Sequence, residues 1–352
     1  MVENCMMKGR KNNLAGVIGY NATTGLGIII SWFKRFLLID SHFIIKHPTI
    51  GYGDLYTLNN IFISKECSDK EMREYIESFN VKTVFIIETP FNFNYFKILK
   101  ENNIKTIFMP MLDTLSINVI LPYKKYIDIV ICPTKICYER YKKWFLNKAI
   151  YLPYPIDTEY FNPKNIEYKN KYFFLHNQGN GGAHWRKGSE QVYKAFKLMQ
   201  HLCENASLWI NRQPTLDPIY HLTQNVDNLN INVMNFSNQI DIYKQGVIYL
   251  APSKREGIGL PIIEAMSCGL PVITTNAPPM NEWITNKDML ISVKKKILWH
   301  TGDTYGYIPD VDDIVNKMVL IYNNSNIKNN NREIVEENFS WNKLKDKYLS
   351  LL

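Results

Sequence analysis

The stretch SKREGIGLPIIEAMSCGLPVITTNAPPMNEW, residues 253–283, decides how this chain is interpreted. It follows an apolar run typical of a buried strand, residues 247–250, and its glycine-spaced segment Glu256-Gly257-Ile258-Gly259 ends where a helical pattern begins. Pro261 suits the first turn of that helix, where no N–H donor is needed. Glycines before a helix N-terminus let backbone N–H groups approach an anion, and the helix dipole favours negative charge there. The stretch therefore predicts a phosphate site at the carboxyl end of a parallel strand.

Two glutamates of this stretch, Glu256 and Glu264, are separated by seven residues. Glu264 is expected about one turn into the helix, where its carboxylate can accept two hydrogen bonds from the vicinal diol of a ribose. An isolated Gly-x-Gly is more often a plain strand, turn and helix. The glutamate pair therefore indicates a binding site only when it is considered together with the whole stretch.

Short apolar runs alternate with helical stretches on both sides of residues 151–165, whose three prolines mark a linker. Before the linker we expect strands at 14–20, 83–87, 105–109 and 127–132 and helices at 28–39, 93–102 and 134–145. After it we expect strands at 172–176, 206–210, 246–251 and 271–275 and helices at 188–200, 260–266, 314–321 and 344–352. Strands that alternate with helices predict an α/β fold with two doubly wound parallel sheets.

The whole of residues 253–283 resembles the donor-binding signature of retaining glycosyltransferases of family 4, which have the GT-B fold. The matching features are Pro252, Ser253, the Glu256/Glu264 pair and the segments 257–261 and 264–272, with Thr274, Thr275 and Glu282 after them. Further similarity lies at 25–27, 157–163, 179–182, 186–188 and 337–341. The resemblance therefore covers most of the chain.

The resemblance implies two Rossmann-like domains that face a cleft. Residues 1–155 would form a basic N-terminal domain on the acceptor side, and residues 156–335 would bind a nucleotide-sugar donor. Residues 336–352 would form a C-terminal helix that packs back on the first domain.

The resemblance also implies roles for individual side chains. Lys187 and Arg186 would meet the charge of the departing diphosphate, with the N–H groups of Gly257, Ile258, Gly259 and Leu260 opposite. Glu264 would hold the ribose, and Glu256 would contact the donor sugar. Glu256 and Lys187 would both be catalytic residues. Gly25 and Gly27 would let the first domain approach the phosphates.

The chain departs from the family pattern at two points. An Arg commonly precedes the Lys-Gly pair by about five residues, where this chain has Gly182; Arg186 and Arg212 remain as substitutes. A His often follows a first-domain strand near the reacting carbon, but residues 108–113 contain none. Asp113 is the nearest catalytic candidate there, with a helix cap or a turn as its structural alternative. Glu88 is a second candidate.

We expect neither a metal nor a resident cofactor. Asp310-Val311-Asp312 spells the D-x-D of metal-dependent glycosyltransferases, but it follows Pro309 and precedes a helical run, so it predicts a helix cap. The seven histidines lack paired-ligand spacing. Cations and backbone N–H groups would hold the donor phosphates instead.

Charge is spread unevenly along the 352 residues. Residues 1–150 carry 20 basic and 13 acidic side chains, and the remainder carries 21 and 20. A basic first half predicts an anionic partner. The candidates are an anionic glycan acceptor and an anionic membrane surface, where basic pairs such as Lys124/Lys125 and Lys142/Lys143 would contact the headgroups. Nucleic acid is disfavoured because no recognised module is present.

The six cysteines are too sparse for a disulfide framework and predict free thiols. Residues 1–13 lack the apolar core of a signal peptide, and no run is long and apolar enough to span a membrane. These features predict a cytoplasmic protein, with the option of peripheral membrane contact.

The resemblance thus implies a retaining, metal-independent hexosyltransferase that moves a sugar from a nucleoside-diphosphate sugar to a hydroxyl of a glycan, glycolipid or glycoprotein. The alternative is a non-catalytic homologue that binds nucleotide or carbohydrate with the same fold. Hydrolysis of the donor by the purified protein distinguishes the two.

Overall fold

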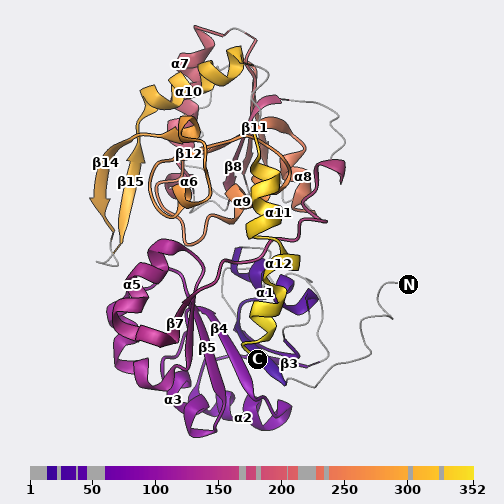
Figure 1. The fold of residues 1–352 in the computed structure, drawn as a ribbon, viewed down its shortest axis with the longest axis vertical. Helices are drawn as coiled ribbons and strands as arrows, with labels where there is room; N and C mark the ends of the chain where they lie inside the picture. Colours follow the sequence, from indigo (N-terminus) through magenta and orange to yellow (C-terminus); the bar gives the residue numbers. More distant parts are fainter. Residues whose placement is uncertain are drawn as a thin grey trace. The chain divides into compact units, whose positions relative to one another are not determined.

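The structure is a computed structural model, and it describes residues 14–21, 25–36, 39–45, 60–165, 172–179, 184–203, 205–212, 227–233, 238–299, 304–324 and 329–352. The chain divides into two compact units (Figure 1). The first unit holds residues 1–133, 137–152 and 346–352, and the second holds residues 134–136 and 153–345.

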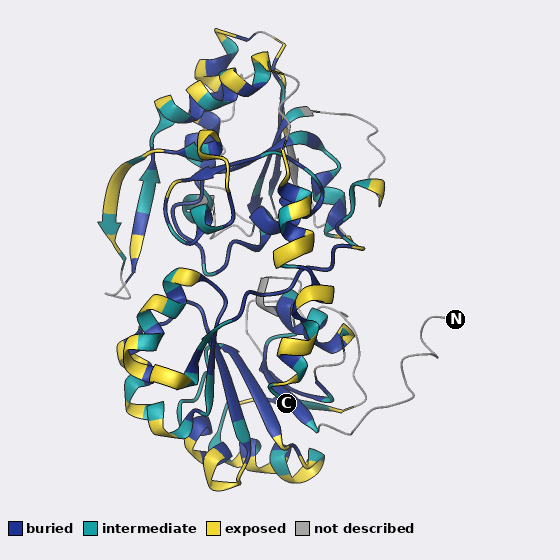
Figure 2. Cartoon of the chain, in the orientation of Figure 1, coloured by how far each residue is buried: buried dark blue, intermediate teal, exposed yellow. Residues whose placement is uncertain are grey.

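The first unit is built on a seven-stranded parallel sheet. Its strands, in spatial order, are β3 (Ile61–Ser64), β2 (Ser41–Ile45), β1 (Ala15–Gly19), β4 (Thr83–Glu88), β5 (Lys105–Pro110), β6 (Ile129–Cys132) and β7 (Ala149–Tyr151). The central strands are apolar along nearly their whole length because helices cover a parallel sheet on both faces. All five residues of β1 and the first five of β4 are buried, as the dark blue strands in Figure 2 show.

Helices alternate with the strands of the first unit along the chain. They are α1 (Gly25–Arg35), α2 (Asp69–Phe79), α3 (Asn94–Glu101), α4 (Ile117–Ile120) and α5 (Lys135–Phe145). Ser68 and Glu71 form a capping box at the start of α2. The C-terminal residues of α12 (Trp341–Leu349) also belong to this unit, where the ring of Tyr348 lies 5.5 Å from that of Phe33.

The second unit contains a six-stranded parallel sheet of the same kind. Its strands, in spatial order, are β10 (Leu229–Val233), β9 (Leu208–Arg212), β8 (Tyr172–Gly179), β11 (Gly246–Ala251), β12 (Val272–Thr275) and β13 (Leu290–Ile291). Its helices are α6 (His184–Lys187), α7 (Ser189–Gln200), α8 (Ile240–Tyr243), α9 (Leu260–Ser267), α10 (Val311–Asn323) and α11 (Asn331–Asn338). Both sheets confirm the predicted pair of doubly wound parallel sheets.

A two-stranded antiparallel sheet, β14 (Val293–Leu298) and β15 (Tyr305–Pro309), extends between β13 and α10. This hairpin was not predicted, because VKKKIL lacks a clear apolar alternation. The other elements that were missed are strands β2, β3, β7, β10 and β13 and helices α2, α4, α8 and α11. Helix α1 begins at Gly25 and not at residue 28 as expected, so Gly25 and Gly27 lie in its first turn.

Two other predictions can be compared with the described residues. Cys67, Cys132, Cys137, Cys203 and Cys268 are free thiols, as expected. Within the described ranges, no helix combines the length and the apolar character that crossing a membrane requires.

Candidate active site

The candidate site lies where the strand order of the second sheet reverses. From β8 the chain first adds β9 and β10 on one side, and β11 then returns to pair with the other side of β8. Loops that follow two such strands diverge and leave a crevice at their carboxyl ends, where open α/β sheets bind ligands. Helix α6 follows β8, and the loop 252–259 follows β11.

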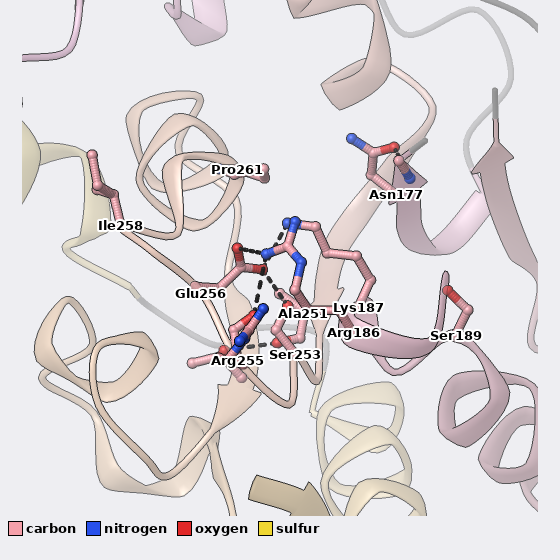
Figure 3. Close-up of polar contacts among 12 residues, drawn as sticks. Asn177, Arg186, Lys187, Ser189, Ala251, Ser253, Arg255, Glu256, Ile258 and Pro261 are labelled. Carbon is pink, nitrogen blue, oxygen red and sulfur yellow. Dashed lines mark hydrogen bonds and ion pairs between the residues drawn. The ribbon is translucent and has the colours of Figure 1, made fainter. Parts of the chain in front are cut away.

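Glu256 is the centre of this site (Figure 3). Its Oε2 receives a hydrogen bond from Nη1 of Arg186 at 2.6 Å, and its Oε1 receives one from Nζ of Lys187 at 2.6 Å. The hydroxyl of Ser253 also donates to Oε1, at 2.6 Å. One carboxylate therefore holds two cations that come from the other side of the switch point.

The electrostatics of the three charged groups follow from their burial. Only 7% of the Glu256 side chain is exposed, against 12% for Lys187 and 25% for Arg186. Burial by itself raises the pKa of Glu256, but Arg186 and Lys187 outweigh burial and lower it to about 2. The carboxylate is ionised at neutral pH, and two cations against one anion leave the cluster with a net positive charge.

Gly188 lets the backbone that carries Arg186 and Lys187 lie close to the loop after β11. It has φ of +73°, and a Cβ at this position would lie 2.2 Å from the carbonyl oxygen of Pro252. Only glycine fits such a close backbone approach. The backbone N–H of Lys254 donates to the carbonyl of Arg186 at 2.8 Å, which fixes α6 to the same loop.

The structure corrects the helix assigned to Arg186 and Lys187. A helix was expected to begin at Gly188 immediately after them, but both residues belong to the short helix α6, and Gly188 is the N-cap of α7. The left-handed conformation of Gly188 ends the first helix and starts the second.

His176 joins the two central strands to α7. Burial lowers the pKa of its buried imidazole to about 4, so the ring is neutral at pH 7. Its Nδ1 lies 2.8 Å from the carbonyl oxygen of Leu250, which can only accept, so Nδ1 carries the proton. Nε2 then accepts from the Ser189 hydroxyl at 2.8 Å. His176 is thus a core residue that sets the position of the α6–α7 turn.

The loop from Gly257 to Leu260 leads into α9, and its backbone N–H groups are hydrogen-bond donors. Gly259 is the N-cap of α9 with φ of +86°, and Trp283 Nε1 fixes the loop by donating to the carbonyl of Ile258 at 2.9 Å. Among the described residues, none accepts a hydrogen bond from the N–H groups of residues 257–260. Unpaired N–H groups at a helix start are suited to an anion.

Glu264 lies on α9 with only 7% of its surface exposed. The Tyr243 hydroxyl donates to its Oε2 at 2.5 Å. Burial raises the pKa of Glu264 to about 7, against the opposing effects of Tyr243 and Lys187. The carboxyl therefore exchanges its proton near neutral pH, unlike Glu256.

The first unit has its own switch point, between β1 and β4. Tyr20 follows β1, Glu88 ends β4 with φ of +69°, and Asp113 lies in a turn after the neighbouring β5. Burial and the nearby Glu88 raise the pKa of Tyr20 to about 12. A non-glycine residue in the left-handed region is strained, and such strain is concentrated at functional sites.

The structure thus brings together Arg186, Lys187, Glu256, Glu264 and residues 257–260 in the second unit. Asp113, Gly25 and Gly27 lie in the first unit. Gly182 falls outside the described residues. Of the two arginines left open as its substitutes, Arg186 bonds Glu256 and Arg212 ends β9.

Asp310 caps α10, as predicted, because its Oδ1 accepts from the N–H of Asp312 at 3.1 Å. No group of three or more potential metal ligands among His, Cys, Asp and Glu occurs within the described part of the chain.

Sequence reasoning gave no role to Ser253, His176, Tyr20 or Tyr243. Ser253 stands within the quoted stretch and could have been found as a polar neighbour of Glu256. Tyr243 and His176 contact their partners 21 and 74 residues away, and no spacing in the sequence indicates such pairs.

Comparison with known proteins shows which sequences and folds this chain resembles. Residues 160–301 match the family model of glycosyl transferases group 1, a segment that includes every second-unit site residue named above. A capsular polysaccharide biosynthesis glycosyltransferase of Staphylococcus aureus, CapM, is 26% identical over 176 residues, which are 47% of this chain and 43% of that protein. The match spans less than half the length of this curated relative.

Solved structures match over nearly the whole chain. A glycosyltransferase from Rickettsia africae has a TM-score of 0.73 at 17% identity and covers 97% of this chain and 98% of its own. HepE of Anabaena, solved in complex with UDP and glucose, has a TM-score of 0.70 at 11% identity, over 96% of this chain and 98% of its own. The chain therefore has the GT-B fold of two Rossmann-like units, and its residues 160–301 match the glycosyl transferases group 1 family.

Proposed function

We propose that this chain is a retaining glycosyltransferase that moves a hexosyl group from a nucleoside-diphosphate sugar to a hydroxyl of a glycan, glycolipid or glycoprotein. The observation that carries the proposal is the pair of cations, Arg186 and Lys187, held on the buried carboxylate of Glu256 at the β8/β11 switch point. The match to glycosyl transferases group 1 and the fold shared with a UDP-bound structure support it.

The diphosphate of the donor is assigned to the space between the cations and the N–H groups of residues 257–260. Three features favour a dianion there: the net positive charge of the Arg186, Lys187 and Glu256 cluster, the available backbone donors, and the N-terminal dipole of α9. We assign the ribose to Glu264, whose carboxyl lies on the same helix.

The chemical step breaks the bond between the sugar and the diphosphate and forms one to the acceptor oxygen. Negative charge grows on the departing diphosphate, so cations fixed beforehand stabilise the transition state more than the ground state. The departing phosphate takes the acceptor proton as the acceptor attacks from the same face, which retains the anomeric configuration. In this account Glu256 orients Lys187 and Arg186, and it also contacts the donor sugar.

We assign the acceptor to the first unit, in which Gly25 and Gly27 lie in the first turn of α1. Tyr20, Glu88 and Asp113 follow three neighbouring strands, β1, β4 and β5, and are the candidates for the residue near the reacting carbon. In this account Arg186, Lys187 and the N–H groups carry the phosphate charge without a metal.

Incubation of the purified protein with a panel of UDP-, GDP- and ADP-sugars, with and without EDTA, tests the proposal. We expect one nucleotide family to be cleaved, release of the nucleoside diphosphate to be unaffected by EDTA, and the product to keep the donor's anomeric configuration by NMR. Binding of a nucleotide sugar with no cleavage in the presence of acceptors would support the non-catalytic alternative. Loss of cleavage on EDTA treatment would contradict the metal-free account.

A further inference from the structure

Two tryptophans stack on each other beside the candidate site. Trp185 belongs to α6, directly before Arg186, and Trp299 directly follows the last residue of β14. Their ring centroids lie 5.1 Å apart, with an angle of 26° between the ring planes. The N–H of Trp299 donates to the carbonyl of Thr304, just before β15, at 2.9 Å, so Trp299 continues the hairpin. The stacked pair therefore joins the β14–β15 hairpin to α6.

Each tryptophan also contacts a cation from the loop after β11. The Nζ of Lys254 lies 4.4 Å from the ring centroid of Trp185, and the Cζ of Arg255 lies 3.9 Å from that of Trp299. Both cations are nearly buried, with 2% of Lys254 and 9% of Arg255 exposed. The face of an indole attracts a cation, more strongly where water is excluded. These four side chains form one group, which we call the indole cluster.

Backbone hydrogen bonds join the same three segments. The N–H of Lys254 donates to the carbonyl of Arg186 at 2.8 Å, and the N–H of Tyr307 on β15 donates to the carbonyl of Lys254 at 2.8 Å. Nη1 of Arg186 also donates to the carbonyl of Arg255, at 3.2 Å. Helix α6, the loop after β11 and the β14–β15 hairpin are thus held together by main chain as well as by side chains.

Helix α6 needs such contacts because it has only four residues. An isolated helix of this length is unstable in water, so tertiary contacts decide where its side chains lie. Trp185 directly precedes Arg186, and Arg255 directly precedes Glu256. The indole cluster therefore joins the two segments one residue away from the ion pairs of Arg186 and Lys187 with Glu256.

The two rings could instead be a stacking surface for a nucleotide base or a sugar. They contact each other and two cations of the same chain, however, which favours a structural element over a platform for a ligand. The cluster also places the charges of Lys254 and Arg255 on indole rings, while the Glu256 carboxylate pairs with Arg186 and Lys187.

We propose that Trp299 is a positioning residue for the two cations of the candidate site. By stacking on Trp185 and contacting Arg255, it holds α6 against the loop after β11. Arg186 and Lys187 then keep one fixed position before a diphosphate arrives. This role rests on the proposed function, because it concerns the cations assigned to the donor diphosphate. Trp299 itself does not touch the donor in this account.

The test compares Trp299→Leu, which removes the ring but keeps apolar bulk, with Trp299→Phe, which keeps a ring for stacking. The matched control is Tyr305→Leu in the same hairpin, because the ring of Tyr305 lies 3.6 Å from Nζ of Lys296 and neither residue belongs to the indole cluster. Thermal melts check that each variant is folded. Calorimetric titration with UDP, GDP and ADP in EDTA then measures Kd, and hydrogen exchange follows the backbone amides of residues 185–187.

We expect the wild type to bind one of the three nucleotides and Trp299→Leu to bind it about 10–100-fold more weakly, which is the contribution of one hydrogen bond to a charged group. Trp299→Phe and Tyr305→Leu should bind within about threefold of wild type, as expected of substitutions that leave the cations in place. Amide exchange at residues 185–187 should be faster in Trp299→Leu and unchanged in the control.

A second comparison separates positioning from a general loss of stability. In a Lys187→Ala background, Trp299→Leu should weaken nucleotide binding by a smaller factor than in the wild type, because one of the two cations that it positions is already gone. A purely structural effect would give the same factor in both backgrounds.

Each contrary result has its own meaning. Equal nucleotide affinity of Trp299→Leu and Tyr305→Leu, or equal factors in the two backgrounds, would overturn the positioning role and leave the proposed function intact. Lost binding in Trp299→Leu with normal amide exchange at residues 185–187 would also overturn it, because Trp299 would then contact the nucleotide directly. A wild type that binds none of the three nucleotides would contradict the proposed function, and the positioning role with it.

Discussion

The Nζ of Lys187 donates to the Oε1 of Glu256 at 2.6 Å across 69 residues of sequence. The two residues follow different strands, β8 and β11, and meet because these strands are neighbours in the sheet. The contact holds a nearly buried ammonium group at a fixed position beside the start of α9. A cation fixed in this way needs no rearrangement when a diphosphate departs.

Lys187→Ala is expected to lower kcat by about 10²–10³, because one preorganised charge contact to a developing anion contributes that much. The matched control is Lys194→Ala on α7, whose lysine pairs with Glu190 at 2.6 Å but is half exposed. Steady-state kinetics should show a near-normal rate for the control. A Lys187→Ala rate within a few-fold of wild type would contradict the assignment of Lys187 to the phosphates.

Glu256→Gln is expected to destabilise the fold by about 3 kcal/mol, since removing one partner leaves nearly buried charges without compensation. Glu190→Gln removes an equally short but exposed ion pair and should cost less than about 1 kcal/mol. Urea denaturation measures both. Equal costs for the two variants would show that the Glu256 cluster is no more buried in solution than a surface pair.

Gly188→Ala should reduce donor affinity and turnover beyond its cost in stability, because the new Cβ meets the Pro252 carbonyl and displaces the adjacent Lys187. Gly269→Ala is the control: Gly269 also has positive φ, +76°, but its Cβ would meet only a proline side-chain carbon at 3.2 Å. Positive φ alone costs about 1–2 kcal/mol at each site. Melting temperatures and donor titrations separate the two effects; a Gly188→Ala protein with normal donor affinity would argue against the close approach.

Glu264 should make stability depend on pH between about 5 and 7. Its folded-state pKa of about 7 exceeds the ordinary value of 4.5, so the folded state binds the proton more tightly than the unfolded state. Stability from this group is complete below pH 4.5 and is lost as pH rises through 7, by on the order of 3 kcal/mol.

Glu264→Gln should remove this pH dependence, which urea denaturation at pH 5 and pH 8 will measure against wild type. The same variant should bind the nucleotide more weakly if Glu264 holds the ribose. Identical pH dependence in the two proteins would mean that Glu264 is not buried as described.

Much of the fold was readable from local patterns, and the reasons for the failures are specific. Strands such as β4 and β11 are short buried runs of β-branched and aromatic residues with helical stretches after them. Helix α2 was missed although Ser68 and Glu71 form a capping box, a signal that the sequence does contain. The β14–β15 hairpin could not be predicted, because its three lysines hide the strand period. Trp299, next to β14, stacks on Trp185, more than a hundred residues earlier.

The site residues also fall into those that the sequence could predict and those that it could not. Residues 256–264 were predictable because loop, helix start and both glutamates lie in one continuous segment. The functional assignment of Arg186 and Lys187 came only from resemblance to a family, and their hydrogen bonds to Glu256, 70 and 69 residues away, were not predicted. The hydrogen bond from Tyr243 to Glu264 had no local signal, since only the packing of α8 against α9 brings the two side chains together.

In the first unit, Glu88→Gln is expected to lower kcat by about tenfold or more with donor KM unchanged, because it removes an ionisable group at the carboxyl end of β4, next to the β1/β4 switch point. Asp113→Asn, in a turn one strand farther away, should have the smaller effect. Kinetics with saturating donor will rank the two. A larger effect for Asp113→Asn would make Asp113 the residue near the reacting carbon.

The most direct test of the central claim is a thermal-shift comparison of wild type and Lys187→Ala with UDP, GDP and ADP in EDTA. The account predicts that one nucleoside diphosphate at about 100 times its Kd raises the wild-type Tm by about 5–10 °C, and that Lys187→Ala loses most of this shift. No shift with any nucleotide, or an equal shift in both proteins, would contradict a diphosphate site at Arg186, Lys187 and Glu256.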